Sequence, residues 1–411
     1  MSFIGGDPLL LHGDIDATVI LIVVVKTILI FALLLVAVMF YIWFMRKVIA
    51  DMQNRIGPQK AGPFGILQTL ADGIKLFFKE QSEPTTADRP VFRLAPYLSI
   101  LPAFLAFAIV PIGGVVSIAG HHTELQLADP PIGVLWLLAM SGVGLYGVML
   151  AGWSSGSKYP LLGAVRASAQ LLSYEAAFGL AVVGVLIQSG TLSTRGIVSK
   201  QAWDGAKSII GSGTTHWYLI PAIGAFVIFL IAALAETNHP PFDLVEAEQE
   251  LVGGFHTEYT GIRFAIFFLA EFMNLITMCA IAVTLFLGGP SGPSAHDLGI
   301  ASNTSVINTW VLPIVWFMLK LLVLLYATVW VRASLPRLRY DQLMNLGWKV
   351  LIEAAFVWAM VTGVVIVARD SYRAHGWDLV ITALCSAVGA ALVLGVLYLC
   401  IPKREEIEEI K

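Results

Sequence analysis

Residues 235–271 read AETNHPPFDLVEAEQELVGGFHTEYTGIRFAIFFLAE and join two long apolar runs. The segment between the runs, residues 236–261, holds six carboxylates: Glu236, Asp243, Glu246, Glu248, Glu250 and Glu258. A seventh, Glu271, lies inside the second run. The bilayer interior disfavours charge, so ionisable residues there or at its edge are functional candidates by default. Such a cluster suits proton handling, cation binding or a response to a nearby redox event, and it does not suit lipid contact.

The composition is that of a membrane protein. Hydrophobic residues make up 57% of the 411-residue chain, charged residues make up 13%, and the mean hydropathy is +0.80. The net charge of −3 gives no indication of a nucleic-acid partner. Cys279, Cys385 and Cys400 lie far apart in apolar runs, so they predict no metal site, iron–sulfur site or disulfide framework. The N-terminus lacks the features of a signal peptide, so we expect the first apolar run to be retained as a span.

Nine apolar runs are long enough to cross about 30 Å of hydrocarbon. They lie at 18–44, 94–118, 133–153, 164–188, 217–235, 262–288, 308–331, 347–368 and 377–401. The sequence therefore predicts an all-α, polytopic membrane helix bundle of about nine transmembrane helices. We expect an outer N-terminal segment (1–17), an eight-span core (18–368), and an extra C-terminal span with a charged tail (369–411).

The basic residues predict the orientation of the chain. With the N-terminus outside, eighteen of the 25 lysines and arginines fall in loops that face the cytoplasm, and five fall in the opposite loops. The positive-inside rule favours this arrangement, which places the acidic loop and the C-terminus in the cytoplasm. Lys320 falls inside a predicted span, where a lone ammonium is costly, so we expect it to pair with a carboxylate.

The cytoplasmic segment 45–93 contains the pattern of an amphipathic helix. Within residues 63–79, PFGILQTLADGIKLFFK, one helical face carries Leu67, Leu70, Ala71, Ile74, Phe77 and Phe78, and the other carries Gln68, Asp72, Lys75 and Lys79. This pattern is typical of a helix at a membrane surface or docked on a bundle. The glycines and prolines of IGPQKAGPFG at 56–65 predict irregular backbone there.

Several ordered blocks of the chain resemble one protein family. The blocks are RKVIADMQNRIGPQKAGPFGILQTLADGIKLFFKE at 46–80, GWSSGSKYPLLGAVRASAQLLSYE at 152–175, AETNHPPFDLVEAEQELVGGFHTEY at 235–259, FFLAEF at 267–272 and RASLPRLRYDQLMNLGWK at 332–349. On these blocks the chain resembles the quinone-site membrane subunit of respiratory complex I, the proton-pumping NADH:quinone oxidoreductase. The bacterial members of this family are called the H subunit. The membrane anchors of energy-converting hydrogenases share part of the pattern.

The resemblance implies a role within an assembly in the bacterial plasma (inner) membrane. NADH would be oxidised elsewhere, and electrons would arrive through iron–sulfur clusters in hydrophilic partner subunits. This chain and adjacent membrane subunits would form the chamber for quinone, either ubiquinone or menaquinone. The chain itself would hold no flavin, metal or iron–sulfur cluster and would have no independent catalytic activity.

The resemblance also assigns roles to particular residues. To the quinone chamber, expected at loops 45–93 and 236–261, it assigns Arg46, Arg55, Asp72, Glu248, Phe255 and Arg332. To proton coupling it assigns Glu175, Glu236, Asp243, Glu246, Glu248, Glu250, Glu258 and Glu271. The quinone path is expected between the first span, the amphipathic helix, the sixth span and the acidic loop. The alternative interpretation is that the arginines only anchor the topology and the buried glutamates are only structural hydrogen-bonding groups.

The chain departs from the family pattern at four places. Met45 stands where the family has a glutamate, so one chamber carboxylate is missing. His239 replaces the usual arginine and could titrate near neutral pH. Glu353 stands where the family often has proline, and the run 377–401 adds a ninth span.

Two other classes of protein remain open at this point. A stand-alone ion transporter also has buried charges and many spans, but it usually shows internal repeats or paired broken helices, which we do not find in the sequence. A structural anchor for a peripheral enzyme explains the basic loops but not the series of buried acids. A transporter would work alone in liposomes, whereas the complex I protein would be inert unless assembled.

Overall fold

The computed structural model describes residues 17–202, 217–243, 252–294 and 306–372, together with residues 388, 391 and 395. The described residues form helices almost throughout, with one two-stranded hairpin. Seven of the described helices are long and apolar enough to cross a membrane. The predicted all-α, polytopic membrane fold is therefore confirmed. The ninth predicted span, 377–401, lies almost entirely outside the described residues.

The long helices follow the apolar runs in order. They are α1 (Ala17–Met52), α3 (Arg89–Phe107), α4 (Gly133–Ser154), α5 (Lys158–Ser189), α9 (Gly261–Phe286), α10 (Leu312–Ser334) and α12 (Ile352–Tyr372). The π-helical turn η3 (Ile307–Val311) leads into α10, and α11 (Tyr340–Asn345) and η4 (Leu346–Leu351) lead into α12. α7 (Ile223–Glu236) is apolar but only 14 residues long, because turns that include Pro221 take up the start of its run.

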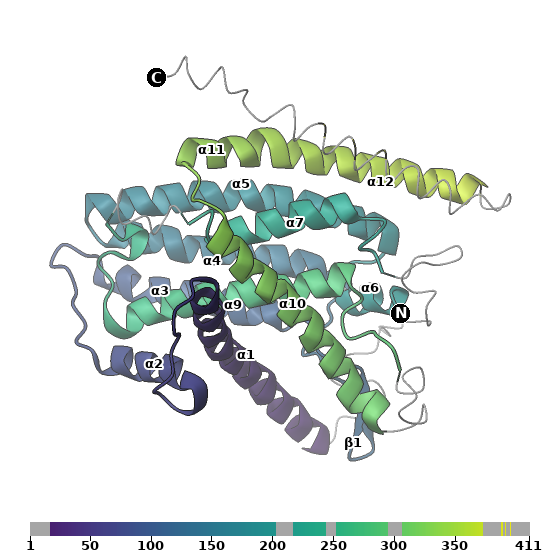
Figure 1. Ribbon diagram of the computed structural model, residues 1–411, viewed down its shortest axis with the longest axis horizontal. Coiled ribbons are helices and arrows are strands. Elements are labelled where there is room, and N and C mark those ends of the chain that lie inside the picture. The colour runs from purple at the N-terminus through teal and green to yellow at the C-terminus, as the bar shows by residue number, and fades with distance from the viewer. Residues whose placement is uncertain are drawn as a thin grey trace.

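One predicted boundary is wrong. The second apolar run predicts a span over 94–118, but α3 ends at Phe107, and Val115–Ile118 forms β1, which pairs antiparallel with β2 (His121–Glu124). Pro111 and the two glycines at 113 and 114 interrupt the run, and proline and glycine are the residues that least favour a helix. The hairpin lies at the same end of the bundle as α6 (Thr194–Lys200) (Figure 1).

α5 and α9 are the central helices of the bundle. α5 packs on α4, α7 and α12, and α9 packs on α1, α2 (Gln68–Phe78), α3, α7 and α10 (Figure 1). Glycines allow close approach between helices: a Cβ atom at Gly224 of α7 would lie 2.4 Å from the Trp358 side chain of α12. Lipid is as apolar as leucine, so such close packing is a main source of helix association in a bilayer.

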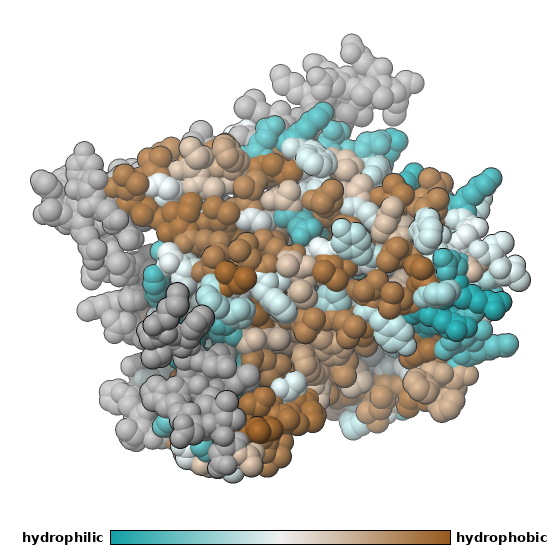
Figure 2. All heavy atoms as spheres, turned by 180° about the vertical axis from the view of Figure 1, so that it is seen from behind, coloured by the Kyte–Doolittle hydropathy of each residue, from teal (hydrophilic) through white to brown (hydrophobic). Residues whose placement is uncertain are grey.

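The outward-facing surface of the spans is apolar. Ile28 and Leu29 of α1 are each 62% exposed, and Val323 of α10 is 61% exposed. Figure 2 shows hydrophobic side chains over much of the face seen from behind, with hydrophilic side chains gathered toward one end. The fold therefore presents to lipid the surface that a multi-pass membrane protein requires.

The predicted amphipathic helix forms as α2, preceded by the short helix η1 (Pro63–Gly65). The irregular backbone expected before it is also present, since Gly62, Phe64 and Gly65 have φ angles of 72°, 55° and 79°. α2 lies beside the bundle at one end (Figure 1), and none of its residues is buried. Its position therefore depends on a few contacts rather than on a core of its own.

Lys320 is buried, but its predicted pairing with a carboxylate is wrong for the described part of the chain. Its ammonium donates hydrogen bonds to the main-chain oxygens of Leu287, Gly289 and Ser291, at 2.7, 3.0 and 2.5 Å. It also lies 4.6 Å from the ring centre of Trp217. These carbonyls follow the last turn of α9, so the lysine caps a helix end, where cations are stabilised by the helix dipole.

Candidate functional site

Two cavities lie on different faces of α9. A large, mostly apolar cavity of about 690 Å³ is lined by α1, α2 and α9, and a small cavity of about 80 Å³, which we call the polar cavity after its three glutamates, is lined mainly by α3, α4, α5, α7 and α9. Ile262, Ala265 and Leu269 line the first, and Phe267, Glu271 and Asn274 line the second. Each set repeats every three or four residues, which is the spacing of one helical face. α9 is therefore the wall between the cavities.

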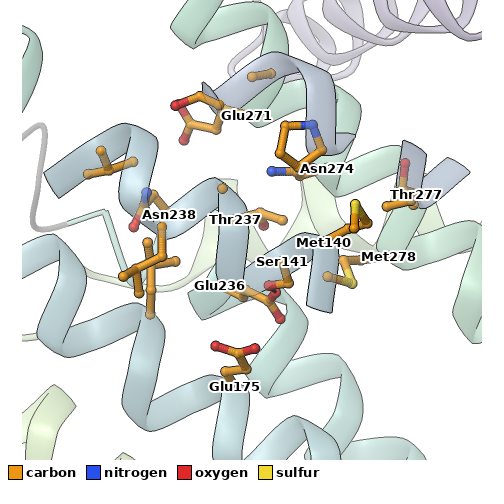
Figure 3. Close-up of a pocket in the computed structure, with 18 of the residues that line it drawn as sticks. Met140, Ser141, Glu175, Glu236, Thr237, Asn238, Glu271, Asn274, Thr277 and Met278 are labelled. Carbon is orange, nitrogen blue, oxygen red and sulfur yellow. Dashed lines mark hydrogen bonds between the residues drawn. The ribbon is translucent and has the colours of Figure 1, made fainter. Parts of the chain in front are cut away.

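The polar cavity brings together three glutamates that the family resemblance assigned to proton coupling. Glu175 comes from α5, Glu236 ends α7, and Glu271 lies in α9. In Figure 3 the carboxylates of Glu175 and Glu236 point toward each other, while Glu271 enters the cavity from the side of Asn274. The cavity has room for several waters, because one water needs about 10–15 Å³ by this measure. Carboxylates and water in this arrangement can bind and pass protons.

Glu236 is held in place by α4. Its side chain is 8% exposed, and its Oε1 accepts a hydrogen bond from the Ser141 hydroxyl. Its Oε2 is buried and has no hydrogen-bond partner among the described residues. An unsatisfied buried acceptor costs about 1–3 kcal/mol, and water in the adjoining cavity would remove that cost.

The turn that follows α7 is fastened to α5 by Gln170. Its amide nitrogen lies 2.8 Å from the Ala235 oxygen, 3.0 Å from the Phe242 oxygen and 3.3 Å from Asn238 Oδ1. Gln170 is 1% exposed, so these bonds are shielded from water. They fix the backbone that presents Glu236 and Asn238 to the polar cavity.

His239 is buried in the same turn. Its side chain is 2% exposed, and its ring lies edge-on to Phe272 of α9, with the ring centres 5.5 Å apart. Burial and the positive charge of Arg332 lower the pKa of His239 to about 3. The prediction that it titrates near neutral pH is therefore wrong, and the imidazole is neutral over the physiological range.

An ion pair forms part of the lining of the apolar cavity. Arg46 Nη1 of α1 lies 2.8 Å from Asp72 Oδ2 of α2, and Gln68 Nε2 donates to Asp72 Oδ1 at 3.1 Å. Most of the remaining lining is apolar and comes from α1, α2 and α9, including Ile42, Leu70, Phe77, Phe78, Phe264 and Phe268. A concave, mostly apolar space with a few placed polar groups is typical of a small-molecule site.

Three other residues assigned to the quinone chamber, Arg55, Phe255 and Arg332, do not line the apolar cavity. Arg55 is exposed beyond the end of α1, where its Nε donates to Gln53 Oε1 at 2.7 Å. Phe255 is 7% exposed and lines the polar cavity rather than the apolar one. Arg332 lines neither cavity and donates a hydrogen bond to the Met45 sulfur at 3.4 Å.

The acidic loop is only partly described. Asp243 is 3% exposed, and its Oδ2 accepts a hydrogen bond from Arg337 at 3.3 Å. Glu258 is half-buried in the turn before α9 and lines neither cavity. Glu246, Glu248 and Glu250 lie outside the described residues.

Three polar residues that shape the polar cavity or support it were not singled out from the sequence. Ser141 and Asn274 line the cavity, and Gln170 holds the turn beside it. All three stand inside long apolar runs. A polar residue at that position is a recognisable signal, because polar groups within a span usually face the protein interior.

A model of the protein family described as NADH dehydrogenase matches residues 25–363. The H subunit of the NADH-quinone oxidoreductase of Frankia casuarinae is 53% identical over 338 residues, which cover 82% of this chain and 71% of that protein. The corresponding H subunit of Frankia alni is 49% identical over 378 residues, which cover 92% of this chain and 78% of that protein. The chain belongs to the NADH dehydrogenase family. The resemblance drawn from the sequence blocks is thus confirmed, and the residues matched by the NADH dehydrogenase family model include the lining of both cavities.

Proposed function

We propose that this chain is the quinone-site membrane protein, or H subunit, of a proton-translocating NADH:quinone oxidoreductase. There it forms much of the quinone chamber and couples quinone reduction to proton movement. The observation that carries the proposal is the pair of cavities on α9, one apolar and one with three glutamates. Quinone is the substrate named in the activity of the relatives. The chain acts as one part of this enzyme and not as a catalyst alone.

Quinone occupies the apolar cavity in this proposal. The tail would lie against the aromatic and aliphatic lining, including Phe264 and Phe268, and the head would pass the Arg46–Asp72 pair. The guanidinium can donate a hydrogen bond to a quinone oxygen, and Asp72 keeps the guanidinium in place. Reduction to quinol takes two electrons and two protons, and the electrons would come from the iron–sulfur cluster that the resemblance places in a hydrophilic partner subunit.

The polar cavity supplies the coupling. Reduction in the apolar cavity changes the charge on one side of α9, and buried carboxylates on the other side respond to nearby charge by binding or releasing protons. Glu271 is the cavity carboxylate that α9 itself carries, and Glu236 and Glu175 continue the path into α7 and α5. Asp243 and the loop carboxylates Glu246, Glu248 and Glu250 would connect this path to the quinone.

The partners follow from the same proposal. With the N-terminus outside and the C-terminus in the cytoplasm, α2 and loop 236–261 face the cytoplasm, where the hydrophilic subunits bind. Adjacent membrane subunits would continue the polar path. The exposed apolar residues of α1 and α10 are available to lipid and to those subunits.

Proton coupling is tested with Glu236→Gln and Glu271→Gln in the assembled complex. Glutamine keeps the size and most of the hydrogen bonding but cannot alternate between charged and neutral forms. We expect assembly to persist, proton pumping in proteoliposomes to be lost, and quinone reduction to fall with it because the two steps are tightly linked. Glu80→Gln, at an exposed position beyond α2, is the matched control. Normal turnover with normal proton stoichiometry in both variants would leave the two glutamates as structural residues.

A further inference from the structure

α2 forms one wall of the apolar cavity but is weakly anchored. None of its residues is buried, and its main contacts with other described elements are to α1 and α9. The Arg46–Asp72 pair ties its middle to α1. The width of the cavity beside α9 must therefore be set by whatever holds the end of α2 that is nearest to α9.

That end is held by a cluster that we call the Glu83 clamp, consisting of Glu83, Arg93, Arg263, Ser82 and Thr260. Glu83 Oε1 lies 2.7 Å from Arg263 Nη2 of α9. Both oxygens of Glu83 also accept hydrogen bonds from Arg93 of α3, each at 3.2 Å. Next to the carboxylate, the Ser82 main-chain nitrogen donates to Thr260 Oγ1 at 2.9 Å, and the two hydroxyls lie 3.2 Å apart.

The backbone around the clamp is close-packed as well. Gly261 begins α9 with a φ of 60°, and a Cβ atom there would lie 3.0 Å from the Lys79 main-chain oxygen. The chain that leaves α2 thus touches the first residue of α9 directly. Only glycine combines this φ with this approach at low cost.

The clamp adjoins the cavity on both sides. Leu76, Phe77 and Phe78 line the cavity and lie four to six residues before Ser82, the first residue of the clamp. Arg263 stands between Ile262 and Phe264, which line the cavity from α9. A displacement at Glu83 therefore moves the aromatic end of α2 relative to α9.

The clamp persists over the working pH range. Hydrogen bonds from Arg93 and Arg263 lower the pKa of the Glu83 carboxyl to about 2, so it stays ionised wherever the enzyme is active. The Arg263 guanidinium is further held by Phe92, whose ring centre lies 5.7 Å away.

We propose that Glu83 is a positioning residue that sets the opening of the apolar cavity between α2 and α9, and thereby determines which quinone tails the cavity admits. The inference rests on the proposed function, in which quinone uses this cavity. Glu83 does not line the cavity. It acts through the spacing of the aromatic side chains on the two helices that it joins.

The test uses assembled complex and quinones with one head group and either short or long isoprenoid tails. We expect Glu83→Gln to raise KM for the long-tailed quinone at least fivefold, to change KM for the short-tailed quinone less, and to leave NADH oxidation by an artificial acceptor unchanged. Arg93→Gln is the matched control, because it removes a partner of Glu83 but leaves the bond to α9. It should stay within about twofold of the parent for both quinones.

A disulfide provides a rescue. Ser82→Cys with Thr260→Cys in the Glu83→Gln background should restore the parental ratio of the two KM values when oxidised and lose it on reduction. If Glu83→Gln fails to assemble, Thr260→Val replaces it as the test variant. Thr260→Val removes only the hydroxyl that accepts from Ser82, and it should shift the ratio of the long-tail to the short-tail KM in the same direction.

Two results would overturn the proposal. One is an unchanged KM ratio in the test variant, which is Glu83→Gln or, if that does not assemble, Thr260→Val; the other is an equal shift of the ratio in Arg93→Gln. Obstruction of the cavity at Gly73 tests the quinone path separately. If Gly73→Phe leaves quinone kinetics unchanged, quinone does not use this cavity and the proposed function fails. If it raises KM while Glu83→Gln does not, only the clamp fails.

Discussion

Gly73 offers the sharpest test of where quinone binds. It lies in the middle of α2 and lines the apolar cavity, and no atom lies within 4 Å of a Cβ atom built there. Any side chain at this position therefore enters open space rather than the core. We expect Gly73→Phe to obstruct the cavity and Gly73→Ala to leave it open.

The expected magnitudes separate obstruction from damage to α2. Alanine inside a helix is more stable than glycine by about 0.5–1 kcal/mol, so Gly73→Ala should stabilise α2 and leave quinone kinetics within about twofold of the parent. Phenylalanine is also a better helix former than glycine, so it does not weaken the helix. It places a ring in the space of the quinone, and a loss of at least 1.4 kcal/mol of binding raises KM by about tenfold or more.

The assay is quinone reduction by assembled complex over a range of quinone concentrations, with NADH oxidation by an artificial acceptor as the measure of the upstream redox chain. We expect Gly73→Phe to impair quinone reduction and to keep NADH oxidation by the artificial acceptor. If Gly73→Phe shows the parental KM and turnover, the cavity between α1, α2 and α9 is not the quinone path. Equal loss of both activities would place the defect upstream and lead to the same conclusion.

Three further predictions concern stability and topology. The folded-state pKa of His239 is about 3, below its ordinary value of 6.5, so the stability gained from the neutral imidazole is complete above pH 6.5 and is lost as the pH falls toward 3. The free energy of unfolding should fall by about 2 kcal/mol by about pH 5, and His239→Gln should make thermal inactivation less dependent on acid pH. A Cβ atom at Gly163 would lie 2.7 Å from the Gly254 backbone, so Gly163→Ala should destabilise the complex by about 1–3 kcal/mol in thermal unfolding, while Gly179→Ala in the same helix, whose nearest contact is 3.9 Å, should not. A reporter fused after Lys411 should be cytoplasmic; a reporter found outside would mean that 377–401 does not span.

Much of the fold could be predicted from the sequence because a bilayer imposes simple rules on chain length and polarity. The long helices match the apolar runs, and α2 matches a 3.6-residue period. The hairpin after α3 was not predicted, since the hydropathy of residues 108–118 resembles that of a span and only Pro111 and the glycines contradict it. Lys320 was placed correctly in a span, but its carbonyl partners come from residues 287–291, and no local pattern shows that contact.

The candidate site was predictable by residue type but not by grouping. Glu175, Glu236 and Glu271 could be singled out as carboxylates in or beside spans, and the structure brings them to one cavity. The resemblance assigns Phe255 to the chamber, yet it lines the polar cavity, because the turn that carries it packs on α4 and α5. His239 could not be assigned a charge from sequence, since its neutral state comes from burial and from Arg332, nearly a hundred residues away in the chain.

The two cavities share a wall that is suited to transmitting displacement. α9 runs without interruption from Gly261 to Phe286 and contains no proline, and glycine occurs in it only at its first residue. Helices bend sharply at such residues or at inserted side chains and waters, so α9 has little means of absorbing a shift locally. Leu269 and Glu271 stand two residues apart, on opposite faces of the helix, and line the apolar and the polar cavity respectively. A quinone that pushes on Leu269 would therefore also move Glu271 relative to Glu236 and Glu175. Coupling by this route needs no continuous chain of proton carriers between the cavities, because the helix itself carries the change.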